Sequence, residues 1–246
     1  MPNHVPMGHT YQFDLEEAKQ AIISLNGDLA FSAAEHLVHQ HFNLGGADFV
    51  SDQATNARRV VLLDALWATQ LFWDPGAHER ILTRLHQNAE HLNAVLGALG
   101  EHALRDEPDA VWEAAREIFP IVMGRHQMQE KQKLSFASKF MHWSTRWHFP
   151  IVDKNARKAI NRFQRDHGIR RGQVLSDTAA VPPSEILPEY KRWVFFYSDL
   201  IRSLEGAGAV PALLEADSAS QIEGLTVDNT LLRILDKVFY WKGSRL

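Results

Sequence analysis

The residues best suited to chemistry lie between Lys131 and Asp153. This stretch carries lysines, serines and a histidine with helical spacing, followed by Phe-Pro-Ile-Val at 149–152 and then Asp153. A lysine amine is a nucleophile once its pKa is low enough to leave it neutral, and a carboxylate stabilises developing positive charge or deprotonates a nucleophile. The combination predicts catalysis centred on Asp153. The alternative is that Asp153 only caps a helix, and the two roles are compatible.

The stretch resembles the helix-hairpin-helix DNA glycosylase superfamily, most closely its 8-oxoguanine glycosylase branch. Pro150-Ile151-Val152-Asp153 matches the Pro-Val-Asp-type segment of that superfamily, with one extra residue. Lys133 lies 20 residues before Asp153, close to the family spacing of lysine and aspartate. The similarity covers about residues 125–165. It departs from the family at the Gly-x-Gly hairpin, where residues 123–128 contain one glycine.

The resemblance implies a DNA N-glycosylase, with or without lyase activity, that acts without a cofactor on a base flipped out of duplex DNA. Asp153 would stabilise the sugar cation, and Lys133 is the candidate amine nucleophile. Lys131 and Lys139 lie nearby, so the choice of lysine stays open. The family default is oxidised guanine, and the degenerate hairpin leaves a hypermodified phage-type base, with a defence role, as an alternative substrate.

Further residues are expected to contact the substrate and the DNA. A polar helix face predicts contacts with the flipped base, or else faces water, and the family's C-terminal helix contributes an aromatic residue. These two criteria select Ser138, Lys139, His142, Tyr240 and Trp241. The expected contacts with DNA phosphates come from Arg125, Lys131, Lys154, Arg157 and Lys158.

Charge is distributed unevenly along the chain. The net charge of −4 divides into −10 for residues 1–124, +9 for 125–171 and −3 for 172–246. The central segment holds 12 basic and 3 acidic side chains, which predicts a local positive field for a polyanion. A catalytically silent nucleic-acid-binding module, or a basic face that meets an acidic protein, would account for the same stripe.

Helical signals dominate the elements that must position these residues. We expect helices over about 15–25, 31–42, 55–73, 81–100, 108–119, 129–146, 154–167, 186–204 and 229–240. A small β element is expected near Ile151 or Val174, since a residue before proline avoids the α region. The fold class is therefore expected to be all-α, with residues 1–246 forming one compact domain, and the resemblance implies that this domain is glycosylase-like and contains a degenerate helix-hairpin-helix. The aromatic residues Trp193, Phe195, Phe196 and Tyr197 are expected in the core, with base stacking as the alternative.

Composition excludes several classes of protein. The chain has no cysteine, which removes disulfides, thiolate metal sites and a cysteine nucleophile. No run approaches the ~18 apolar residues of a membrane-spanning helix. Residues 1–10 show no apolar signal segment, so a cytoplasmic location is expected. The resemblance implies DNA as the partner, and a monomer is expected. The cluster His36, His39 and His41 lacks a metal-binding pattern, and no metal is predicted.

Overall fold

The computed structural model describes residues 10–42, 49–50, 52–67, 71, 75–123, 131–145, 148–169 and 183–246. These residues form α-helices and contain no strand, which confirms the all-α class. The helices are α1 (Leu15–Asn26), α2 (Leu29–Phe42), α3 (Gln53–Trp67), α4 (Ala77–Gln87), α5 (Ala89–Gly97), α6 (Ala103–Asp106), α7 (Pro108–Met123), α8 (Lys131–Thr145), α9 (Lys154–Asp166), α10 (Pro183–Gly206), α11 (Val210–Ser220) and α12 (Leu231–Ser244).

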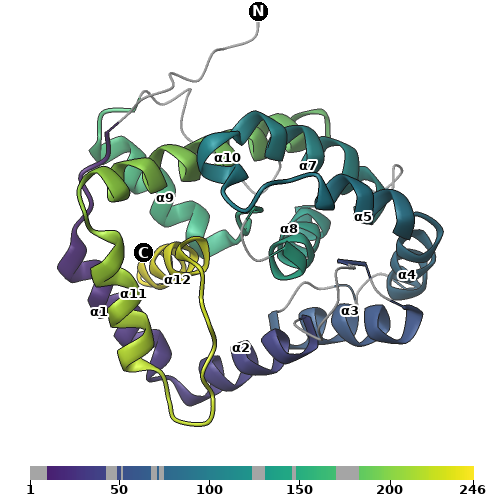
Figure 1. Ribbon diagram of the computed structural model, residues 1–246, viewed down its shortest axis with the longest axis horizontal. Helices are drawn as coiled ribbons and strands as arrows, with labels where there is room; N and C mark the ends of the chain where they lie inside the picture. The colour runs from purple at the N-terminus through teal and green to yellow at the C-terminus, as the bar shows by residue number, and fades with distance from the viewer. Residues whose placement is uncertain are drawn as a thin grey trace, which may run out of the picture.

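Two central helices carry the residues of interest. Figure 1 shows α8 and α12 end-on in the interior, with the other helices arranged around them. Helix α12 packs most extensively against α9 and also contacts α1, α10 and α11, whereas α8 packs against α2, α3 and α7. The segment between α8 and α9 therefore leads from one central helix to the main neighbour of the other.

The caps at two helix starts follow the sequence signals. Asp14 accepts a hydrogen bond from the Glu17 N–H at 2.9 Å, and α1 begins at the next residue. Asp153 accepts from the Asn155 N–H at 2.7 Å, and α9 begins at Lys154. In each case a side-chain oxygen satisfies an N–H that the first helical turn leaves unpaired, so these two predicted boundaries are confirmed.

Two expectations about helix boundaries are wrong, and the β element is not found at one of its two expected places. The helix expected over 81–100 is two helices, α4 and α5, because Asn88 leaves the helical conformation and its side-chain amide donates to the Arg84 carbonyl at 2.8 Å. Pro120 was expected to end the preceding helix, yet α7 continues to Met123. The β element expected near Ile151 is absent, since residues 149–153 carry no regular hydrogen-bonded structure. The Val174 region and residues 124–130, where the hairpin was expected, lie outside the described residues.

Arginine side chains bind the carbonyl groups that helix ends leave free. Arg84 donates to the carbonyls of Ile121 (2.8 Å) and Val122 (3.0 Å), which supports the last turn of α7 beyond Pro120. Arg59 donates in the same way to the carbonyls of His41 (3.1 Å) and Phe42 (3.3 Å) at the end of α2. A carbonyl without an intrahelical partner is thereby satisfied from a distant helix.

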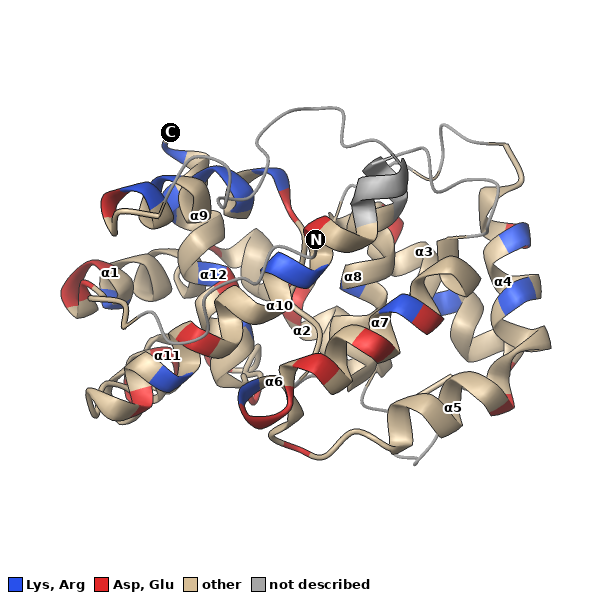
Figure 2. Cartoon of the chain, turned by 90° about the horizontal axis from the view of Figure 1, so that it is seen from above, with Lys and Arg blue, Asp and Glu red and all other residues tan. Residues whose placement is uncertain are grey.

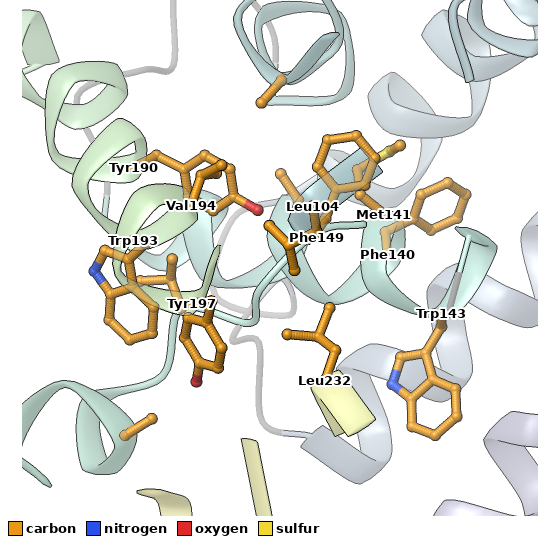
Figure 3. Packing of buried hydrophobic residues seen from close by; sticks show 14 of the residues in the cluster. Leu104, Phe140, Met141, Trp143, Phe149, Tyr190, Trp193, Val194, Tyr197 and Leu232 are labelled. Carbon is orange, nitrogen blue, oxygen red and sulfur yellow. The ribbon is translucent and has the colours of Figure 1, made fainter. Parts of the chain in front are cut away.

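One continuous hydrophobic cluster runs through the described helices. Figure 3 shows its aromatic centre, with Tyr190, Trp193 and Tyr197 of α10 on one side and Phe140, Met141 and Trp143 of α8 on the other. Phe195 and Phe196 are 7% and 3% exposed, so the expectation that the α10 aromatics form core is confirmed. No helix in the described parts of the chain is both long and apolar enough to cross a membrane.

Candidate functional site

Asp153 stands at the junction between the buried 149–152 segment and α9. Its backbone is extended (φ −122°, ψ 150°), and its Oδ1 accepts the Asn155 N–H at 2.7 Å. The side chain is 22% exposed, while Ile151 and Val152 are 3% and 4% exposed. Because one oxygen is held by the helix cap, the carboxylate has a single orientation with part of its surface open to solvent.

Two residues predicted to contact the substrate hold this segment against α8. Ser138 Oγ accepts the Val152 N–H at 3.0 Å, and His142 Nδ1 lies 3.0 Å from the Phe149 carbonyl oxygen. Ser138 and His142 are 0% and 1% exposed, so the alternative that this face points to water is wrong. Both side chains anchor the backbone that delivers Asp153, and their contact with a substrate stays a prediction.

Lys139 is the lysine that the structure places beside Asp153. Its Nζ lies 3.7 Å from Asp153 Oδ2 and donates to the Trp67 carbonyl at 3.0 Å, and the residue is 4% exposed. Burial lowers the pKa of Lys139, whereas the negative charges of Asp153 and Asp236 act in the opposite direction. Lys133 lies in the first turn of α8, but its side chain, like that of Lys131, is outside the described residues.

Half-buried aromatic rings lie next to this pair. The centroid of the Phe31 ring lies 5.5 Å from that of Trp67 and 6.2 Å from that of Tyr240. Burial raises the pKa of Tyr240, and the charge of Asp153 raises it further. Tyr240 therefore lies within electrostatic range of Asp153, and its contact with a base stays a prediction. Trp241 instead lines a separate cavity of about 410 Å³ together with Arg162, Phe163 and Lys242.

A buried ionic network on α12 was missed by the sequence analysis. Arg233 Nε donates to Glu35 Oε1 at 2.7 Å, and its Nη1 donates to Asp236. Lys237 Nζ binds Glu35 Oε2 at 2.8 Å and Asp217 Oδ1 at 3.1 Å. All five residues are at most 4% exposed.

The sequence does carry a signal for this network. Residues 233, 236 and 237 share one helix face and interrupt a run that is otherwise apolar from Leu231 to Phe239. A helix with apolar residues on every side is buried, so charges within it require partners. The partners come from α2 and α11, which no local pattern links to α12.

The predicted DNA-contacting residues lie mainly on α9. Lys154 is exposed, and Arg157 and Lys158 are partly exposed. Figure 2 shows lysine and arginine gathered on α9 and at the nearby C-terminal end, with the acidic residues of α6 and α7 on the lower side of that view. Arg125 is outside the described residues. The basic side chains of α9 therefore form a surface that begins next to Asp153.

Comparison with models of known protein families, with characterised proteins and with solved structures finds no match for this chain. A function for this chain therefore has to follow from the geometry around Asp153. Within the described residues, no group of three or more histidine, aspartate or glutamate side chains is arranged to hold a metal ion.

Proposed function

We propose that this protein is a DNA N-glycosylase whose chemistry is centred on Asp153. The observation that supports the proposal most strongly is a carboxylate fixed by a helix cap, 22% exposed, with its second oxygen 3.7 Å from the buried Lys139 ammonium. A carboxylate held in this way can lie beneath a deoxyribose and stabilise the positive charge that develops at C1′ as the base leaves. Because its orientation is fixed, the carboxylate does not have to reorient as the positive charge develops.

The neighbouring residues fit a nucleic-acid substrate. The basic surface of α9 starts at Lys154, directly after Asp153, and suits the phosphates on either side of a flipped nucleotide. The half-buried rings of Phe31, Trp67 and Tyr240 offer apolar faces against which an unstacked base can pack.

The bond changes depend on the nucleophile. In a hydrolytic reaction the oxygen of water joins C1′, Asp153 accepts the proton of that water, and the base leaves from C1′ and is then protonated. With an amine nucleophile, the lysine nitrogen joins C1′, the base leaves, and the sugar ring opens to give a Schiff base. Lys133 is the candidate for that nitrogen by spacing, while Lys139 is nearly fully buried and already paired with Asp153.

The proposal is tested with labelled duplexes, each carrying one modified base. The set includes 8-oxoguanine, uracil, hypoxanthine, 5-hydroxymethylcytosine and its glucosylated form. We expect the wild-type protein to produce alkali-labile sites on at least one duplex, and Asp153→Asn to lower the rate at least ~100-fold, as for the loss of one electrostatic catalytic group. The matched control is Asp166→Asn, at the exposed far end of α9, which should retain the wild-type rate.

Borohydride trapping separates the two mechanisms. A trapped protein–DNA adduct that is lost in Lys133→Gln identifies the amine route, and base release without an adduct identifies the hydrolytic route. If the wild-type protein binds DNA but releases no base from any duplex, the glycosylase proposal is wrong. The catalytically silent nucleic-acid-binding module is then the better description, and its affinity should fall steeply with salt.

A further inference from the structure

The buried charges near the candidate site do not balance. Seven ionisable side chains gather here: the carboxyls of Glu35, Asp153, Asp217 and Asp236, and the cations Lys139, Arg233 and Lys237. The Lys139–Asp153 pair lies beside the α12 network, because Lys139 donates to the Trp67 carbonyl at 3.0 Å and the Arg233 guanidinium lies 5.0 Å from the centroid of the Trp67 ring. Four carboxyls face three cations. Since an excess buried negative charge is unfavourable, one carboxyl of this group is expected to hold a proton over part of the neutral pH range.

The geometry identifies Asp236 as that carboxyl. Glu35 and Asp217 each bind Lys237, and Asp153 has its helix cap and Lys139. Asp236 binds Arg233 through Oδ2, but its Oδ1 is buried without a hydrogen-bond partner among the described residues. Burial raises the pKa of Asp236 to about 7, although the charge of Arg233 lowers it.

Asp236 also interacts electrostatically with the charged residues of the candidate site. The charged and titratable groups that face it are Arg233 and Tyr240 on its own helix, Lys139 on α8, Asp153 before α9, Glu35 on α2 and Tyr197 on α10. The negative charge of Asp153 raises the pKa of Asp236 and the positive charge of Lys139 lowers it, while ionised Asp236 in turn raises the pKa of Lys139. Asp236 and Asp153 therefore share the field of one ammonium group.

We propose that Asp236 is a positioning residue that acts through Lys139. Its ionisation state determines how much of the negative charge of Asp153 the Lys139 cation neutralises. With Asp236 protonated, the Lys139 cation neutralises Asp153. With Asp236 ionised, the same cation is divided between two carboxylates, and more of the negative charge of Asp153 faces the reacting sugar. The consequence for catalysis rests on the proposed function, whereas the linkage between Asp236 and Lys139 does not.

The linkage is measured by NMR on full-length protein without DNA. In protein labelled with 13C at lysine Cε, the Lys139 resonance is identified by its absence from Lys139→Met. We expect this resonance to shift in a step near pH 7 in the wild type and to lose the step in Asp236→Asn. The matched control is Asp217→Asn, which removes another buried carboxyl from the group but should keep the step at Lys139.

The reciprocal measurement does not depend on whether Asp236→Asn folds. In protein labelled with 13C at aspartate Cγ, the Asp236 carboxyl should titrate at about pH 7 in the wild type. In Lys139→Met it should titrate at higher pH, because the cation that lowers its pKa is gone. A Lys139 resonance without a step near pH 7, or an Asp236 titration unchanged by Lys139→Met, would overturn the linkage.

The catalytic consequence is read from the pH profile of base release. The wild-type rate should rise as pH increases through about 7, and the rise should be absent in Asp236→Asn. A profile that Asp236→Asn leaves unchanged would overturn the catalytic role. If the NMR linkage is present but no duplex loses a base, it is the glycosylase proposal that fails and not the linkage.

Discussion

Helices α10 and α12 are both buried, but they are held in place by different forces. Helix α10 contributes aromatic rings, with Tyr190 and Trp193 fully buried among apolar neighbours. Helix α12 contributes Arg233, Asp236 and Lys237, each at most 4% exposed and joined to α2 and α11. Apolar contacts are non-directional and tolerate similar shapes, whereas a buried ion pair fails when one partner is removed. We expect the ionic network of α12 to be sensitive to the loss of one charge and to pH, whereas the aromatic contacts of α10 should not depend on pH.

The largest expected effect is that of removing Arg233. Arg233→Met keeps the length of the side chain but leaves Glu35 and Asp236 buried without their shared cation. We expect the free energy of unfolding to fall by about 4 kcal/mol, as for other broken buried ion pairs. Urea denaturation followed by circular dichroism measures the change. A loss below about 1 kcal/mol would show that the α12 network contributes no more to the free energy of unfolding than a surface ion pair does.

The second largest expected effect is a pH dependence of the free energy of unfolding that arises from α12 and not from the tyrosines of α10. The pKa of Asp236 is raised from 3.8 to about 7 in the folded protein, so its contribution to stability is complete below the unfolded pKa and is lost as pH rises through 7. From pH 5 to pH 8 this amounts to about 3 kcal/mol. The quantity to measure is the difference in unfolding free energy between wild type and Asp236→Asn at each pH. Burial raises the pKa of Tyr190 and Tyr197 well above 10, so Tyr197→Phe should show no such dependence.

A smaller effect is expected where α12 meets α9. A Cβ added at Gly243 would lie 1.7 Å from the Asn155 carbonyl oxygen, so Gly243→Ala must push the start of α9 away. We expect a loss of about 2 kcal/mol in unfolding free energy, as in an overpacked core, together with reduced base release because Asp153 precedes α9. Gly97→Ala is the control, since nothing lies within 4 Å of the added atom. Equal stabilities for the two variants would contradict the close packing of α9 and α12.

The smallest expected effects distinguish two tyrosines within α10. The Tyr190 hydroxyl donates to the Pro150 carbonyl at 3.1 Å, and Tyr190→Phe should lower the unfolding free energy by about 1 kcal/mol. The Tyr197 hydroxyl is buried without a hydrogen-bond partner in the described structure, so Tyr197→Phe should be neutral or slightly stabilising. Thermal unfolding of the two variants provides the comparison. A greater loss in Tyr197→Phe than in Tyr190→Phe would mean that the Tyr197 hydroxyl has a polar partner.

Local signals were sufficient for much of the fold. The caps at Asp14 and Asp153, the apolar faces of the helices and the aromatic core on α10 follow from spacing and residue type. The continuation of α7 beyond Pro120 does not, because its last carbonyls are satisfied by Arg84 from another helix. Local patterns therefore predict where a helix can begin, but not which distant side chain allows it to continue.

The candidate site likewise has features that follow from the local sequence and features that depend on how the helices pack. The sequence by itself determined that a carboxylate follows the Pro-Ile-Val segment and starts a basic helix, since capping and charge are local properties. Only the tertiary structure decided that Lys139 faces Asp153, that Ser138 and His142 anchor the segment, and that buried Asp236 lies behind the pair. The physical reason is that burial and electrostatic coupling depend on which helices pack together, and this packing brings residues far apart in the chain into one low-dielectric site.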